Sequence, residues 1–383
     1  MNDVLAVICV VVWLYLIAGR CNFWLCRVRD TGQTPQLEQW PAVVAVVPAR
    51  NESEYIAASA GSLLRQEYAG AFSIIVVDDD SSDETAAMAM HAAASVSDRQ
   101  MTVVNGKGPP PGWTGKLWAL KQGIDIAEKQ LRPDYLLLTD ADIEHAPDTL
   151  AWLVKQSSAG RYVLTSLMAK LRCESFAERT HVPAFIYFFQ MLFPFSWVCR
   201  PGSSTAAAAG GCMLVRTDAL ASVGGIASIR NALIDDCSLA EKLKTIGPIW
   251  LGLTDRVRSI RPYDTLSDVK RMISRSAYPQ LRYSPLLLAA TVASMAITFI
   301  IPPLLTIFAT GLPRFLGLVA WLAMTLSFVP TLQFYRLSRL WSLALPVIAL
   351  LYLYYTLGSA YLFARGQGGQ WKGRIHADAP SLQ

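Results

Sequence analysis

The sequence predicts an α/β domain with a mostly parallel sheet, flanked by an N-terminal transmembrane anchor and C-terminal transmembrane helices. Between residues 41 and 283, short apolar runs that suit buried strands alternate with helical segments, which is typical of βαβ units. Hydrophobic residues make up 53% of the 383 residues and charged residues only 16%. These fractions lie above and below the usual globular values, so we expect part of the chain to enter a membrane.

The first apolar run, Val4 to Ala18, predicts a transmembrane anchor within residues 1–29. Arg20, Arg27 and Arg29 follow the run, whereas a signal peptide carries its positive charge before the apolar segment. Positive charge gathers on the cytoplasmic side of membrane helices. We therefore expect a multi-pass protein of the inner membrane whose large domain faces the cytoplasm. A buried core helix is the alternative interpretation of this run.

Composition also bears on the kinds of site and partner. Seven cysteines are scattered without a Cys-x-x-Cys pair, and the four histidines do not cluster with them. The sequence therefore predicts neither a zinc site nor a disulfide framework, and reduced thiols in a cytosolic environment are expected. The net charge of +5 is mild, and no nucleic-acid partner is expected.

Three of the expected strands end in polar or acidic loops. After a linker over 30–41, the expected strands are Val43–Val47, Ser73–Val77, Met101–Val104, Tyr135–Leu138 and Arg161–Ala169, with helices over Tyr55–Gln66 and Leu117–Lys129. The first, second and fourth strands run into the polar loops. Parallel strands place such loops along one edge of the sheet, where a ligand would bind.

Two carboxylates, Asp140 and Asp142, follow the strand Tyr135–Leu138. Side chains two positions apart leave an extended segment on the same side, so both can point at one place. A pair of hard oxygen ligands suits a divalent metal, Mg²⁺ or Mn²⁺, that also takes phosphate oxygens. An acidic turn without a ligand is the alternative.

Two further segments carry candidate residues. Gly112 to Lys116 resembles a P-loop but has Pro110 where the first glycine is needed, although Lys116 can still meet a phosphate. Asp235 and Asp236 precede a periodic apolar helix, so their carboxylates lie at a helix N-terminus, where negative charge is favoured. A helix cap is the alternative, and both roles can hold at once.

An aromatic segment over 185–197 predicts a helix at the membrane–water boundary. It is short for a span and contains Pro194, and aromatic side chains are typical of this boundary. A buried core helix is the alternative. A basic stretch from Arg256 to Arg282 can meet phosphate or lipid headgroups, or it can form a solvated face.

Three apolar runs within residues 285–364 are each long enough to span a membrane, and a tail follows over 365–383. The runs are Leu286–Ala309, Leu312–Leu332 and Leu343–Phe363. With four spans in all, Arg365, Lys372 and Arg374 would lie outside, against the positive-inside rule. A re-entrant or interfacial run among the three is therefore an open alternative.

Four motifs, in this order, together resemble the family 2 glycosyltransferases of the GT-A fold. They are the loop Pro48–Glu52, the loop Asp78–Asp83, Asp140 with Asp142, and Asp235 with Asp236. The likeness covers about residues 41–280, and the motifs are specific jointly rather than singly. It implies a UDP-sugar donor bound at this edge of the sheet together with a divalent metal.

The resemblance assigns donor-binding roles to single residues. It implies that Glu52 and Asp79 hold the ribose and the uracil of the UDP-sugar. Lys116 would meet the diphosphate. The remaining donor-binding candidates that the resemblance implies are Pro48, Asp140 and Arg275.

The resemblance also implies the metal ligands and the base. Asp142 would be the metal ligand, with Asp140 beside it at the ribose or sugar. Asp236 would be the general base that takes a proton from the acceptor hydroxyl, with Asp235 in support. In-line attack on the face opposite UDP would invert the anomeric centre.

One departure from the family pattern narrows the implied activity. Processive members carry Gln/Arg-x-x-Arg-Trp before the C-terminal membrane segments, whereas residues 270–278 supply Arg275 and no tryptophan. Long-polymer synthesis is therefore less expected. The anchor, the membrane helices and the Arg-Ser-Ala-Tyr sequence together look most similar to the bacterial hopanoid-biosynthesis-associated glycosyltransferases.

The resulting hypothesis is an inverting, membrane-bound transferase that passes a sugar from a UDP-sugar to a lipid hydroxyl, in hopanoid biosynthesis or a similar pathway. Two alternatives stay open. One is a processive polysaccharide synthase of the same fold. The other is a non-catalytic assembly protein on a glycosyltransferase scaffold.

Overall fold

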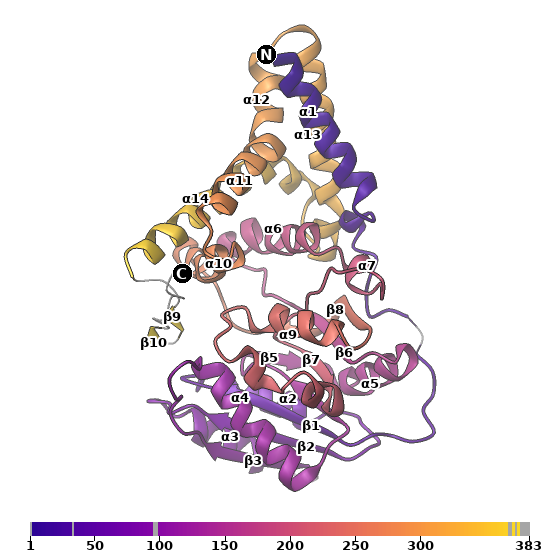
Figure 1. The fold of residues 1–383 in the computed structure, drawn as a ribbon, viewed down its shortest axis with the longest axis vertical. Helices are drawn as coiled ribbons and strands as arrows, with labels where there is room; N and C mark the ends of the chain where they lie inside the picture. Colours follow the sequence, from indigo (N-terminus) through magenta and orange to yellow (C-terminus); the bar gives the residue numbers. More distant parts are fainter. Residues whose placement is uncertain (1, 33, 95–98, 367–369, 372–373, 376–383) are drawn as a thin grey trace.

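The structure is a computed structural model that describes residues 2–32, 34–94, 99–366, 370–371 and 374–375 (Figure 1). The molecule is elongated, with a sheet domain at one end and a bundle of apolar helices at the other. A layer of shorter helices lies between the two. The tail expected from residue 365 lies largely outside the described residues.

Within the described residues, eight strands form one mixed, mostly parallel sheet in the order β3-β2-β1-β4-β7-β6-β8-β5. The strands are β1 Val43–Ala49, β2 Phe72–Asp78, β3 Gln100–Asn105, β4 Tyr135–Leu138, β5 Ile143–His145, β6 Leu164–Lys170, β7 Met213–Arg216 and β8 Ile249–Ser259. β1 pairs in parallel with β2 and β4, β2 with β3, and β6 with β8. β7 is antiparallel to β4 and β6, and β5 is antiparallel to β8. The predicted α/β fold class is confirmed.

Strand β1 shows why the apolar runs become central strands. All seven of its residues are buried. Val44 and Val46 pack into the core layer on one face of the sheet, together with Leu120 of helix α4 (Gly115–Ile126). Val43 and Val47 pack into the layer on the other face, under helix α2 (Ile56–Leu64). A strand covered on both faces needs no polar alternation, and this is what its sequence shows.

The sequence did not predict β5, β7, β8 or helix α5 (Thr149–Gly160). The first half of β8 is buried, whereas its second half carries Asp255, Arg256 and Arg258 and pairs with the three-residue β5. Charged residues in a strand near the sheet edge lower its hydropathy, so the strand does not appear as an apolar run in the sequence. The remaining helices of the sheet domain are α3 Thr85–Ala94, η3 Ala127–Leu131, α8 Thr217–Ser222, η4 Ile226–Ile229 and α9 Asp235–Lys244.

Four apolar helical stretches in the described part of the chain are long enough to cross a membrane. They are Asn2–Gly19, Pro285–Phe308, Gly311–Phe334 and Arg339–Ala364. Their elements are α1 Asn2–Leu14 with η1 Tyr15–Gly19, α11 Pro285–Met295, η5 Ala296–Ile300, α12 Ile301–Phe308, α13 Gly311–Phe334, η6 Arg339–Ala344 and α14 Leu345–Ala364. All four coincide with the apolar runs that the sequence shows.

The layer between sheet and bundle contains α6 (Phe176–Leu192), α7 (Phe195–Val198) and α10 (Leu266–Gln280) (Figure 1). Helix α6 starts well before the aromatic segment expected at 185–197 and ends ahead of Pro194. Its Tyr187 is fully buried, and its hydroxyl pairs with Ser327 of α13 at 2.7 Å. The short elements η2 Phe23–Leu25, β9 Gln370–Trp371 and β10 Arg374–Ile375 complete the described chain.

The side of the membrane on which the sheet domain lies can be tested with cysteines at two exposed positions. Glu84 lies in the sheet domain, and Thr310 lies in the loop that joins α12 to α13 at the far end of the bundle. Because basic residues follow α1, an impermeant maleimide should label Thr310→Cys in intact cells and Glu84→Cys only after lysis. Cys237 is buried and cannot serve as the reporter. The wild-type chain gives the background, and labelling of Glu84→Cys in intact cells would reverse the orientation.

Candidate active site

A cavity of about 1160 Å³ opens at the carboxyl ends of β1 and β4. Eight of the predicted site residues line it, namely Pro48, Glu52, Lys116, Asp140, Asp142, Asp235, Asp236 and Arg275. The ninth, Asp79, is fully buried and does not line the cavity; its carboxylate lies 3.8 Å from Arg50. The structure therefore brings together the motifs that the sequence singled out, except for this acidic residue after β2.

Parallel pairing of β1 and β4 brings two of the motifs side by side. Val46 of β1 is in register with Leu138 of β4, and β1 continues to Ala49, so the segments that follow both strands leave the sheet at the same edge. The expected extended arrangement from Asp140 to Asp142 is wrong, because residues 141 and 142 form a turn. The hydroxyl of Thr139 donates to the carbonyl of Gly211 at 2.7 Å, which fastens the start of this segment.

Lys116 joins two of the motifs through its ammonium group. Its Nζ lies 2.9 Å from Asp140 and 3.0 Å from Asp235. Thr114 caps the helix that carries it by accepting the Leu117 N–H. Burial opposes the charge of the lysine, but the two neighbouring carboxylates outweigh burial and raise its pKa. Lys116 is thus a permanent cation that ties the loop after β4 to the start of α9.

Arg261 joins the carboxylates of Glu52 and Asp142. Nothing in the basic stretch from Arg256 to Arg282 distinguished it from the other arginines. Its Nε lies 2.6 Å from Asp142, and its Nη2 donates to Glu52. The guanidinium also stacks over the ring of Tyr55 at 4.8 Å. Burial opposes its charge, whereas Asp142 and Glu52 raise the pKa of Arg261. Because β8 was not predicted, no signal placed Arg261 at the end of a neighbouring strand.

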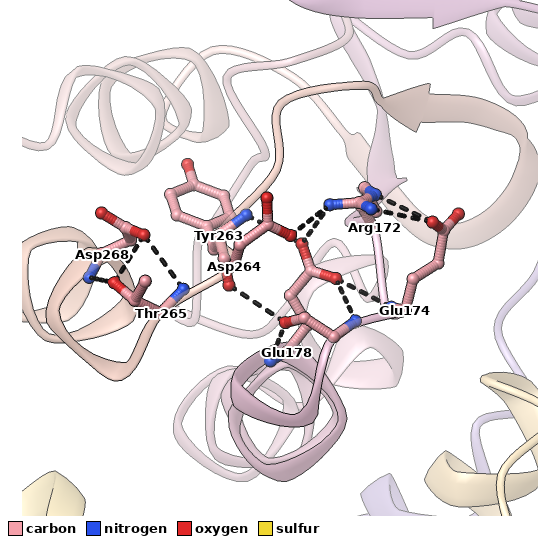
Figure 2. Close-up of polar contacts among 8 residues, drawn as sticks. Arg172, Glu174, Glu178, Tyr263, Asp264, Thr265 and Asp268 are labelled. Atoms are coloured by element: carbon pink, nitrogen blue, oxygen red, sulfur yellow. Dashed lines mark hydrogen bonds and ion pairs between the residues drawn. The ribbon is translucent and has the colours of Figure 1, made fainter.

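Hydrogen bonds hold the backbone on both sides of Arg261, at Ile260 and at Tyr263. The Ile260 N–H donates to the carbonyl of Asp142 at 3.0 Å. On the other side, Glu178 of α6 accepts the Tyr263 N–H at 2.8 Å and pairs with Arg172 (Figure 2). Glu178 is fully buried, and backbone N–H donors hold its pKa below the usual range even though burial opposes this. The guanidinium therefore reaches the cavity from a fixed point on the chain.

Asp236 lies at the start of α9 with one oxygen on each of two backbone donors. Gly210 N–H donates to Oδ2 at 2.9 Å, and Cys237 N–H donates to Oδ1 at 2.7 Å. Burial, followed by the negative charge of Asp235, raises the pKa of Asp236 to about 6. Asp235 instead faces Lys116. The two adjacent carboxylates thus have different partners, and Asp236 has the properties of a base near neutral pH.

The residues present fit a divalent metal that arrives with the donor. The described residues contain no group of three histidine, cysteine, aspartate or glutamate side chains that could hold a metal. Asp140 and Asp142 supply two hard oxygen donors, each paired with a cation in this structure. Mg²⁺ and Mn²⁺ commonly bind through one or two carboxylates and take their other ligands from water and phosphate.

The comparison with known families follows from this geometry. Residues 44–224, which contain β1, β2, β4 and β7, match the glycosyl transferase family 2 model. The matched segment belongs to the family 2 glycosyltransferases. The match ends before Asp235, Asp236 and Arg261, so these cavity-lining residues lie beyond the matched segment.

One solved structure supports the fold, with a TM-score above 0.5. The transferase is similar to the mannosyltransferase PcManGT from Pyrobaculum calidifontis, solved with GDP-Man and Mn²⁺, with 17% identity, 94% of this chain and 98% of that chain covered, and a TM-score of 0.56. It is also similar to S. aureus TarS 1-349 in complex with UDP, with 14% identity and a TM-score of 0.39; the likeness covers 85% of this chain and 92% of that chain. No curated protein matches the sequence.

We expect Arg261→Gln to strengthen the binding of Mn²⁺ in the absence of any nucleotide. The substitution removes a competing cation from Asp142 and leaves Glu52 and Asp142 without it, so a metal is attracted more strongly. The expected gain is about tenfold in Kd, or roughly 1.4 kcal/mol. Thermal unfolding of the purified chain in detergent, titrated with Mn²⁺, measures this through the rise in Tm.

Two variants control the Arg261 measurement. Arg258→Gln removes an exposed arginine from β8, the strand that precedes Arg261, and should leave the Mn²⁺ response unchanged. Arg261→Lys keeps a positive charge and should lie between the wild-type chain and Arg261→Gln. An equal Mn²⁺ response in all four proteins would contradict the competition.

Proposed function

We propose that the transferase is membrane-bound and inverting, and that it passes a sugar from a UDP-sugar to the hydroxyl of a lipid. The observation that carries this proposal is the extent of the cavity. One end holds the carboxylates of the motifs, and the same cavity continues to Phe185 and Phe189 of α6 and to Leu362 and Phe363 of α14. An apolar acceptor can thus lie against the helices nearest the bundle while its hydroxyl reaches the carboxylates.

The donor half of the mechanism rests on charge. A UDP leaving group develops negative charge as the glycosidic bond breaks, and cations fixed near it stabilise the transition state. Lys116 and Arg261 are the two fixed cations at this end of the cavity, and Arg275 lines the same space. A divalent metal held by Asp142 and Asp140 would supply further Lewis-acid stabilisation of the diphosphate.

The acceptor half rests on Asp236. Its carboxylate takes the proton of the lipid hydroxyl as the oxygen attacks the anomeric carbon, and the bond from that carbon to UDP breaks on the opposite face. This displacement inverts the anomeric configuration. Asp235 supports the base by holding Lys116 in place rather than by contacting the acceptor.

A hopanoid is the acceptor that the sequence resemblance favours, and we keep it as the finer form of the proposal. The missing tryptophan after Arg275 speaks against polymer synthesis. PcManGT was solved with GDP-Man, so GDP-sugars belong in the same assay as UDP-sugars.

The proposal predicts one sugar added per lipid. Purified transferase, labelled UDP- or GDP-sugars and a membrane lipid extract with or without hopanoids should give a small, organic-soluble product, and mass spectrometry identifies the lipid. A product of high molecular weight would instead show a polymer synthase. Absence of product with every donor would favour the non-catalytic alternative.

Metal dependence should be lost with Asp142. We expect EDTA to abolish turnover by the wild-type chain and Asp142→Ala to lower it at least ~10²-fold, on the scale of losing a major electrostatic stabiliser. Glu144→Ala, two residues further along, is the matched carboxylate control because Glu144 does not line the cavity. Full wild-type activity in EDTA would eliminate the metal.

The pH dependence should report Asp236. A base with a raised pKa is protonated below that value, so kcat/KM should fall as the pH drops through about 6. Asp236→Asn should lower transfer by ~10²–10⁴-fold and remove this acid limb, while donor binding stays near that of the wild-type chain. Asp235→Asn should keep the limb but move it to lower pH, because it removes a negative charge that helps to raise the pKa of Asp236. A limb near pH 4 in the wild-type chain would show that Asp236 is not the group that titrates.

A further inference from the structure

Helix α14 begins on the side of the bundle that faces the sheet domain. The preceding span, α13, ends at Phe334, whose carbonyl accepts from Lys170 of β6 at 2.9 Å. The η6 segment that follows places Trp341 against Phe176 at the start of α6, with ring centroids 5.9 Å apart. Both contacts are to elements of the sheet domain or of the layer next to it, so α14 starts there as well.

The same helix also ends on that side. In its last turn, Phe363 stacks on Tyr283 with ring centroids 4.4 Å apart, and Tyr283 lies just before α11 begins at Pro285. Figure 1 shows α14 running obliquely toward α10, away from the tip of the bundle. A 20-residue helix is about 30 Å long, so a crossing would carry its end to the opposite face of a membrane.

The inner face of α14 packs along α6 and α10 through polar contacts. The Tyr352 hydroxyl donates to the carbonyl of His181 at 2.9 Å. Ser274 donates to the carbonyl of Tyr355 at 3.3 Å, and the Tyr278 N–H donates to Ser359 at 3.2 Å. Helix α10 also carries the basic residues Lys270, Arg271 and Arg275. Such a neighbour suits the headgroup region rather than the hydrocarbon core.

The outer face of α14 is a stripe of large side chains. Its members are Val347, Leu350, Tyr354, Leu357 and Tyr361, each between 43% and 63% exposed. Spacings of three and four residues place them along one side of a helix. Cations border the stripe, because Lys270 lies over the Tyr354 ring at 5.0 Å and Arg365 donates to the Tyr361 hydroxyl at 3.0 Å.

We propose that α14 lies in the plane of the membrane surface, within the leaflet next to the sheet domain. The stripe would face the acyl chains, and the basic residues of α10 would face anionic headgroups. The chain then crosses the membrane three times, and its C-terminal end returns to the side of the sheet domain. This inference rests on the membrane attachment proposed above.

Two features of the molecule agree with this placement. Arg365 and Arg374, two basic residues that follow α14, come to the side where the positive-inside rule places them. Leu362 and Phe363 of α14 line the active-site cavity, so an interfacial α14 brings the open end of that cavity to the depth of lipid headgroups. A lipid acceptor could then reach Asp236 without leaving the leaflet completely.

The side of the C-terminus distinguishes three crossings from four. A single cysteine appended to the end of the full chain is compared with Glu84→Cys, both probed with an impermeant maleimide in intact and lysed cells. We expect the same result for both cysteines: either both are labelled in intact cells, or both are labelled only after lysis. Labelling of one in intact cells and of the other only after lysis would overturn the inference, even where the orientation or the activity proposed above also fails.

The depth of the stripe gives a second, independent readout. Spin labels at Val347→Cys, Tyr354→Cys and Tyr361→Cys, in vesicles with anionic lipid, should show equal, shallow depths by collision with oxygen and with a water-soluble nickel chelate. A crossing helix would change depth by about 10 Å between neighbouring labels. Leu312→Cys, Val319→Cys and Leu326→Cys on α13 are the matched control and should show such a gradient. The same gradient on α14 would overturn the proposal.

Discussion

Two partly buried cations, Lys116 and Arg261, hold the acidic loops of this site together. Glu52, Asp142 and the pair at the start of α9 come from distant parts of the chain, and carboxylates repel one another strongly in a cavity of low dielectric constant. Lys116 bridges Asp140 and Asp235, and Arg261 bridges Glu52 and Asp142. Because each cation links two motifs, the charge balance that makes the loops compatible also fixes their relative positions. In the proposed reaction, a donor diphosphate would meet positive charge that is already in place.

The layer of α6, α10 and α14 connects this charge arrangement to the apolar bundle. Glu178 at the start of α6 holds the segment that carries Arg261 by accepting the Tyr263 N–H (Figure 2). Further along the same helix, Tyr187 packs against α13. The cavity passes through this layer, so its lining changes from carboxylates to aromatic side chains within one space. In the proposed function, the aromatic part of this cavity is the side that would receive a lipid acceptor.

Much of the fold could be predicted because the central strands are apolar on both faces. Val43–Val47 and Tyr135–Leu138 became β1 and β4, and the polar residues that follow them line the cavity as expected. Asp79 did not follow this pattern, because burial against Arg50 removes it from the cavity surface. Arg261 was missed for the opposite reason. It follows a strand whose charged second half resembles a surface loop, and only pairing with β5 and β6 reveals that strand.

The sequence alone determined β1 to β4 and β6, the motif order and the apolar helices, because these depend on local patterns of hydropathy and charge. It also determined that Asp235 and Asp236 begin a helix. Only the tertiary structure decided which cation meets which carboxylate, because those pairs join residues up to 209 positions apart. It likewise decided where α14 lies. A helix that is apolar along its whole length can cross a membrane or rest on its surface, and the contacts at its two ends distinguish these arrangements.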